Sequence, residues 1–98
     1  MNTRSKGQRS VRKCIQRLSS VGWWCEPVER AGKFQKKDLF DLWDIIAIKP
    51  TRTKLIQVKT NRKPKLNIYK NFQKTFPQFD CEVWVWHDRK SFKIDRLW

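Results

Sequence analysis

Three polar residues in the middle of the chain have the side-chain types that handle metal ions and phosphates. The apolar run 42–48 has no alternation and predicts a strand buried on both sides, which Asp44 interrupts. Gln57 and Lys59 share one face of a predicted strand over residues 54–60. A carboxylate and an amide oxygen are hard ligands suited to Mg²⁺ or Mn²⁺. A metal held there can bind a phosphate and lower the pKa of a bound water, while a neighbouring lysine orients that water or neutralises developing charge. The three residue types therefore favour metal-dependent hydrolysis of a phosphodiester.

These side chains can act together only if the two segments form a hairpin in a suitable register. The residues between them, 49–53 (KPTRT), form a turn marked by proline. With a two-residue loop, Asp44 lies opposite Gln57, and with a four-residue loop it lies opposite Lys59. Both registers place all three side chains on one face, whereas a loop of odd length would separate them. The competing interpretation is a structural Asp–Lys ion pair within a sheet.

Apolar periodicity predicts the elements around this hairpin. A helix is expected from about Arg9 to Gly22, with an apolar stripe on one side and a basic face on the other. A second helix is expected over 66–76, ended by Pro77, and further strands over 23–29, 81–87 and 92–98. Pro27 indicates either an edge position or a bulge for the first strand. Residues 1–8 are predicted to form a flexible basic arm, and residues 1–98 a single domain of the α+β (mixed α/β) class.

The stretch DLWDIIAIKPTRTKLIQVKTN, residues 41–61, resembles the core motif of the PD-(D/E)xK nuclease superfamily. In that motif an Asp on one strand of a hairpin is followed by Glu, Asp or Gln and then, two residues later, by Lys. The chain is most similar to the archaeal and phage Holliday junction resolvases, which are small and basic and begin with a K-G-containing arm. Lys6-Gly7 occupies that place, and the resemblance covers roughly residues 6–87. It implies a restriction-endonuclease-like αβββαβ core, with a mixed sheet flanked by two helices.

The resemblance also implies roles for individual residues. Asp44 would bind Mg²⁺ or Mn²⁺, Gln57 would fill the position usually held by an acid, Val58 would lend its backbone carbonyl, and Lys59 would be the catalytic lysine. The implied activity is structure-selective cleavage of DNA, four-way junctions above all. The implied partner protein is a second copy of the chain, because a two-fold dimer supplies two symmetric incisions.

The chain departs from the resolvase pattern in its acids. The resolvases place a Glu on the first helix, whereas residues 7–22 contain no acid, and Val11 stands about where it would be expected. A second metal-binding carboxylate would then come from elsewhere. Asp41 is the first choice, and the alternatives are Asp38, Glu29 and Glu26. Asp38 and Asp41 are equally consistent with loop capping or with pairing to nearby lysines.

Composition restricts the class of partner. The 98 residues hold 23 Lys and Arg against 9 Asp and Glu, a formal net charge of +14, which indicates a polyanionic partner. Three cysteines without a C-x-x-C pair and a single histidine exclude a zinc finger and favour small core residues. The absence of a signal-like or membrane-spanning stretch predicts an intracellular, cytoplasmic protein, of prokaryotic, archaeal or phage origin by the resemblance. The residues expected to hold DNA are Arg4, Lys6, Arg9, Arg12, Lys13, Arg62, Lys63 and Lys65.

Two other functions and two interpretations of the tryptophans stay open at this stage. The chain is also compatible with a catalytically weak or inactive nucleic-acid-binding protein on the same fold, or with a small basic RNA-binding protein. Trp84, Trp86 and Trp98 could form a platform on which bases stack. Alternating aromatic residues more often cover a core or a dimer interface.

Overall fold

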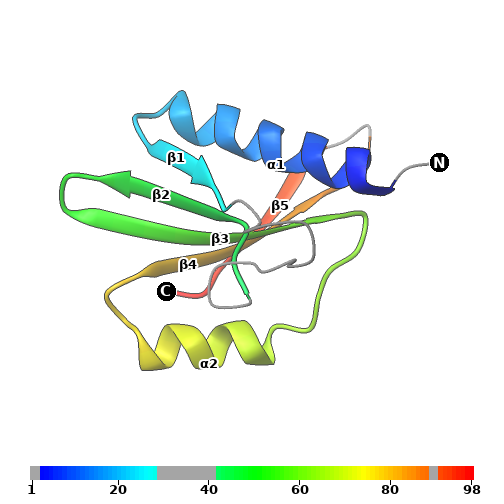
Figure 1. Cartoon of the computed structure of the whole chain (residues 1–98). Helices are drawn as coiled ribbons and strands as arrows, with labels where there is room; N and C mark the ends of the chain where they lie inside the picture. The colour runs from blue at the N-terminus through cyan, green and yellow to red at the C-terminus, as the bar shows by residue number, and fades with distance from the viewer. Residues whose placement is uncertain (1–2, 29–41, 89–90) are drawn as a thin grey trace.

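The computed structural model describes residues 3–28, 42–88 and 91–98, with side chains from residue 9 onward. In these ranges the elements follow the order that the sequence predicts (Figure 1). The helices are α1 (Thr3–Ser19) and α2 (Asn67–Thr75). The strands are β1 (Trp24–Pro27), β2 (Ile45–Lys49), β3 (Arg52–Thr60), β4 (Asp80–Trp86) and β5 (Phe92–Arg96). The described elements therefore confirm the predicted α+β class.

The described strands form one mixed sheet in the order β1-β2-β3-β4-β5. Neighbouring strands are antiparallel except β3 and β4, which run parallel and are connected through α2. A parallel pair needs such a crossover because the chain must return to the starting edge. Helix α1 covers one face of the sheet and α2 the other (Figure 1). β1 lies at an edge of the sheet, which confirms the edge alternative for Pro27.

Each face of the sheet carries its own hydrophobic core, because successive strand residues point to opposite sides. The core under α1 is formed by Cys14, Leu18, Trp23, Ile45, Ala47, Ile56, Val58 and Trp84. The core under α2 is formed by Trp43, Leu55, Tyr69, Cys81, Val83 and Val85. The burial of Trp84 confirms the core interpretation for this residue and excludes it as an exposed platform for bases.

One buried side chain ties α2 to the sheet. The Gln73 amide accepts a hydrogen bond from the Cys81 backbone N–H and donates one to the Phe79 carbonyl, both at 2.7 Å. Trp43 packs edge-on against Tyr69 at a centroid distance of 5.3 Å. The position of Trp43 matters for the site, because it immediately precedes Asp44.

Two sequence-based expectations are wrong in detail. Helix α1 begins at Thr3, so residues 3–8 are helical rather than an arm; without a proline, each further residue adds a hydrogen bond to an existing helix. The apolar run 42–48 is not buried on both sides, since β2 begins at Ile45 and Ile48 is 45% exposed. The residue opposite Ile48 on β1 is Trp24, which is also exposed. The apolar composition of the run did not show that the buried part of β2 ends before Ile48.

Candidate functional site

The hairpin register brings the predicted polar residues together. Lys49 pairs with Arg52, so the loop consists of the two residues Pro50 and Thr51. The two-residue alternative is therefore confirmed. The regular pairing ends at Ile45 opposite Ile56, so Asp44 lies just beyond it, with its carboxylate beside the Gln57 amide.

The backbone of Asp44 is held on both sides just before β2 begins. Its carbonyl accepts the Val28 N–H at 2.8 Å, and its own N–H donates to the Ile56 carbonyl at 2.9 Å. The second bond joins residues one position away from the regular β2–β3 pairing. The ladder is therefore distorted at Asp44, as is common where a sheet directs a functional side chain.

The Asp44 carboxylate lies against the backbone of β3. Its Oδ2 accepts the Val58 N–H at 3.0 Å. The Gln57 amide nitrogen donates to the same Oδ2 at 3.2 Å and to the Leu42 carbonyl at 2.6 Å, which is the orientation that satisfies the hydrogen-bond network. Gln57 is only 4% exposed, so its amide has to find partners within the fold. Asp44 and Gln57 thus form a direct pair.

The donor set has the chemistry of a hard-cation site. If the Gln57 amide turned by 180°, its oxygen would face the Leu42 carbonyl and Asp44 Oδ2, and three oxygens would converge. Such a cluster is repulsive by itself and is stabilised by a cation between the oxygens. In an extended strand the N–H and C=O of one residue point to the same side, so the Val58 carbonyl is directed toward the Asp44 edge. By donor type, Asp44, Gln57 and Val58 fit Mg²⁺ or Mn²⁺.

Lys59 lies on the same face of β3 as Gln57. It follows Gln57 by two residues on β3, a separation of about 7 Å along the strand, and its side chain is half-buried. The intervening Val58 belongs to the core under α1, so Lys59 must point to the α2 side. The Asp44 carboxylate, bound to the Val58 N–H, lies between the Gln57 and Lys59 positions.

The second carboxylate is the incomplete part of the site. Asp41, Asp38 and Glu29 lie outside the described residues. Glu26 is described, and it is exposed on β1 opposite Ile46. Within residues 3–28, 42–88 and 91–98, no group of three or more His, Cys, Asp or Glu side chains could hold a metal ion. The described site therefore offers one carboxylate, one amide and one backbone carbonyl.

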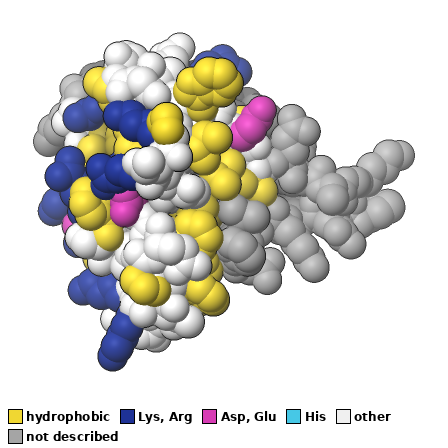
Figure 2. All heavy atoms as spheres, turned by 90° about the vertical axis from the view of Figure 1, so that its left-hand side faces the viewer, with side chains coloured by type: hydrophobic (Ala, Val, Ile, Leu, Met, Phe, Trp, Pro, Cys, Tyr) yellow, Lys and Arg dark blue, Asp and Glu magenta, His cyan; other side chains and the backbone are white. Residues whose placement is uncertain are grey.

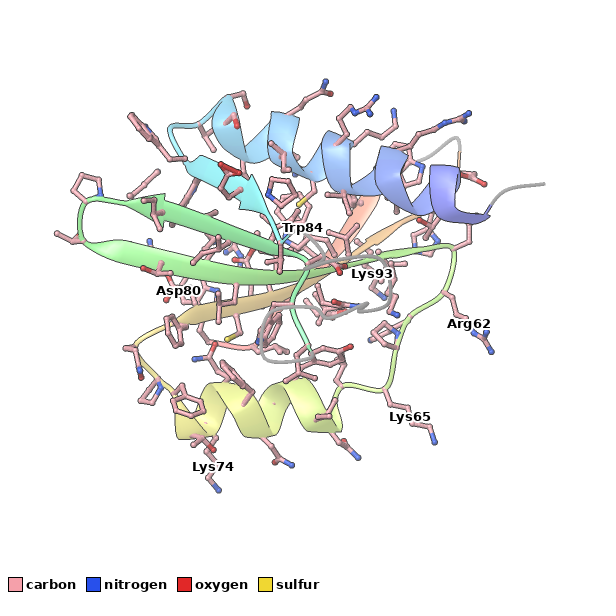
Figure 3. All side chains as sticks on the ribbon, viewed as in Figure 1. Arg62, Lys65, Lys74, Asp80, Trp84 and Lys93 are labelled. Atoms are coloured by element: carbon pink, nitrogen blue, oxygen red, sulfur yellow. The ribbon has the colours of Figure 1, made fainter. Side chains whose placement is uncertain are left out.

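The predicted DNA-contacting cations lie on two exposed surfaces. Arg9, Arg12 and Lys13 are exposed on α1, with the Lys13 ammonium 4.9 Å from the centre of the Trp86 ring. Arg62 and Lys65 project outward from the segment between β3 and α2 (Figure 3).

One cation of the segment after β3 is tied to the sheet. Lys63 Nζ lies 3.6 Å from Oδ2 of Asp95 on β5. The backbones of Arg4 and Lys6 belong to α1, and their side chains are outside the described part. Because the segment between β3 and α2 follows soon after Lys59, its cations lie close to Lys59 along the chain.

The thiols have no reactive character. Cys14, Cys25 and Cys81 are all free, and Cys14 and Cys81 are fully buried. Burial raises the pKa of the Cys81 thiol to about 12 from its ordinary value of 9.0, and burial also raises the pKa values of Cys14 and Cys25. A thiol kept protonated is a poor nucleophile, so the fully buried Cys14 and Cys81 are unsuited to thiolate chemistry.

One buried ionic residue escaped the sequence analysis. Glu82 on β4 is 1% exposed and forms an ion pair with Lys54 of β3. Strand alternation does place Glu82 on the face of Trp84, but only the parallel β3–β4 pairing brings Lys54 to it. No signal along the chain connects the two residues, because that pairing depends on the crossover through α2.

Comparisons with known proteins support the fold. A solved structure, the Holliday junction resolvase Hjc from the archaeal hyperthermophile Archaeoglobus fulgidus, superposes with a TM-score of 0.66. The two chains are 19% identical, and the match covers 93% of this chain and 77% of the other. No protein-family profile matches the chain, and no curated protein matches it. The described part of the chain holds no helix long and apolar enough to cross a bilayer. The chain thus has the fold of an archaeal resolvase.

Proposed function

We propose that this chain is a divalent-metal-dependent endonuclease that hydrolyses phosphodiester bonds in branched DNA, four-way junctions in particular. The observation that carries the proposal is the contact between Asp44 and Gln57, two residues before Lys59 on β3, on a fold similar to that of the resolvase Hjc. The same fold serves many functions, so the proposal depends on the site and not on the fold alone.

Each residue of the constellation has a distinct task. Asp44, Gln57 and the Val58 carbonyl would hold Mg²⁺ or Mn²⁺, and the metal, when bound, would supply Lewis acidity and an activated water. The Val58 N–H fixes one carboxylate oxygen of Asp44, which leaves the orientation of that side chain determined by the sheet. Lys59 would stabilise the negative charge that develops on the phosphate.

The exposed cations would hold the DNA backbone beside this site. Arg9, Arg12 and Lys13 of α1 form one surface, and Arg62, Lys63 and Lys65 form the other. If about five phosphates are contacted, a plot of log affinity against log salt should have a slope of about −4.5. A homodimer would present two such sites to the two strands that are cut.

The experiment is metal-dependent nicking of a labelled four-way junction. Asp44→Asn and Lys59→Ala should each lower the rate by at least about a hundredfold. The exposed Lys74 in the last turn of α2, changed in Lys74→Ala, serves as the matched control for Lys59→Ala and should leave the rate unchanged. The mechanism is wrong if the wild type cuts no junction, or if both site variants cut normally.

Metal binding gives a second readout that does not depend on cleavage. Titration with Mn²⁺ should show one site, which Asp44→Asn removes and Gln57→Glu strengthens, because a second carboxylate replaces a neutral amide. Equal affinity in the wild type and in Asp44→Asn would contradict the assignment of Asp44.

A second candidate function is a non-catalytic DNA-binding protein on this fold. It is favoured by the described donor set, which contains a single carboxylate, and by the lack of any acid in residues 7–22. It predicts junction binding of the same salt dependence, with neither cleavage nor a Mn²⁺ site. A preference for duplex RNA over branched DNA in competition would instead support the small basic RNA-binding alternative.

A further inference from the structure

Indole rings and cations alternate at the end of the sheet where the β2–β3 hairpin turns. We name these residues the cation–indole cluster: Trp23, Lys49, Arg52, Lys54, Arg96 and Trp98. The Lys54 ammonium lies between two rings, 4.9 Å from the centre of Trp23 and 5.1 Å from that of Trp98. Figure 2 faces this end of the molecule and shows Lys and Arg side chains interleaved with hydrophobic ones.

The remaining cations of the cluster extend the same arrangement outward. The Arg52 guanidinium lies 4.9 Å from the Trp98 ring, and that of Arg96 lies 5.7 Å from it. On the other ring, the Lys49 ammonium lies 4.7 Å from Trp23. The side chains of Arg52 and Arg96 are 45% and 67% exposed, so they remain accessible to an external anion.

The Trp98 ring is both exposed and held in place. It is 49% exposed, and its Nε1–H donates to Glu82 Oε2 at 3.1 Å. Glu82 is itself buried and fixed by Lys54 and by the Trp84 Nε1–H at 2.9 Å. The exposed part of the indole is therefore oriented before any ligand arrives, which lowers the entropy cost of binding.

The charge of the cluster indicates an anionic ligand. Lys49, Arg52, Lys54 and Arg96 face two acids, Glu82 and Asp80, the latter paired with Arg52. The cations exceed the acids, and the guanidinium groups of Arg52 and Arg96 lie over the Trp98 ring, which is 49% exposed. A ligand that carries both a flat aromatic group and phosphates matches this surface, and an unpaired nucleotide has both.

We propose that the cation–indole cluster binds single-stranded DNA, with a base stacked on Trp98 and phosphates on Arg52 and Arg96. Lys49 follows Asp44 by five positions, about 17 Å of extended chain, so this surface is distinct from the proposed hydrolytic site. The inference goes beyond that site and needs neither metal nor cleavage. Binding of single-stranded DNA at this end of the β-sheet would suit a protein that acts where the two strands of a DNA duplex separate.

The test measures binding of a fluorescein-labelled thymidine oligonucleotide by anisotropy, in EDTA. Trp98→Ala should raise Kd roughly tenfold or more, the loss expected for one base–aromatic stack. Trp98→Phe keeps a ring and loses only the Nε1–H donor, so it should retain most of the affinity. Arg96→Gln should reduce the magnitude of the log–log salt slope by about 0.7.

The chain offers a matched control for an exposed indole. Trp24 is 79% exposed on β1, and its strand neighbour across the sheet is the apolar Ile48 rather than a cation. Trp24→Ala should therefore bind the oligonucleotide as the wild type does. Circular dichroism of each variant establishes that the fold is retained.

Three results would overturn the proposal. Unchanged affinity of Trp98→Ala excludes stacking on that ring, and an equal loss in Trp24→Ala shows that any exposed indole suffices. A concentration-dependent dimer that Trp98→Ala abolishes, together with unaltered oligonucleotide binding, assigns the surface to a second copy of the chain. Asp44→Asn should bind the oligonucleotide normally, so failure of the hydrolytic proposal leaves this one separately testable.

Discussion

The buried carboxylate of Glu82 provides a strong test of how this sheet is stabilised. Replacing Glu82 with Met keeps a side chain of similar length and removes the charge. It leaves the Lys54 ammonium, 7% exposed, without its carboxylate, and it removes the acceptor of the Trp84 and Trp98 indole N–H groups. Breaking one side of a buried ion pair costs about 3–5 kcal/mol.

That loss is large for a domain of this size. A chain of 98 residues has a free energy of unfolding of about 5–15 kcal/mol, so Glu82→Met should remove about a fifth of it or more. With a urea m-value of about 2 kcal/mol/M, the midpoint of unfolding should fall by roughly 2 M. Arg96, 3.9 Å from Glu82 but mostly exposed, contributes little to this figure.

A double variant separates the charge effect from the loss of packing. Lys54→Met combined with Glu82→Met removes both charges and should be at least about 2 kcal/mol more stable than Glu82→Met alone. Glu26→Met, at an exposed position, should shift the free energy of unfolding by less than about 0.5 kcal/mol. The reasoning is refuted if Glu82→Met costs under about 1 kcal/mol, or if the double variant is no more stable than the single one.

Further predictions concern the attachment of α2 and the thiols. Gln73→Leu leaves two backbone groups without partners and should lower the free energy of unfolding by about 2–4 kcal/mol, whereas Asn71→Leu on the exposed side should not. A thiol reagent at pH 8 should label half-buried Cys25 faster than Cys14 or Cys81, as mass spectrometry of the labelled peptides would show. Because the folded pKa of Cys81 is raised from 9.0 to about 12, its stabilising contribution is present below pH 9 and is lost as the pH rises toward 12. Cys81→Ala should therefore flatten the decline of stability over that range, measured by urea unfolding.

The elements and the polar constellation were predictable from the chain because they depend on local patterns. The alternation in 81–87 and the apolar stripe of α1 follow from the geometry of strands and helices. Strand periodicity placed Gln57 and Lys59 on one face, whereas the sequence left open whether the hairpin loop has an even or an odd number of residues. The choice between two even loops was not predictable, and the Lys49–Arg52 pairing decided it.

The sequence by itself determined the order of the elements, the large positive charge and the candidate residues Asp44, Gln57 and Lys59. Only the tertiary structure decided which side chains of β3 and β4 are in contact. Lys54 meets Glu82, and both meet Trp98, because a parallel crossover through α2 brings together residues far apart in the chain. Side-chain periodicity carries no information about such contacts, since it records which face a residue occupies and not which strand lies next to it.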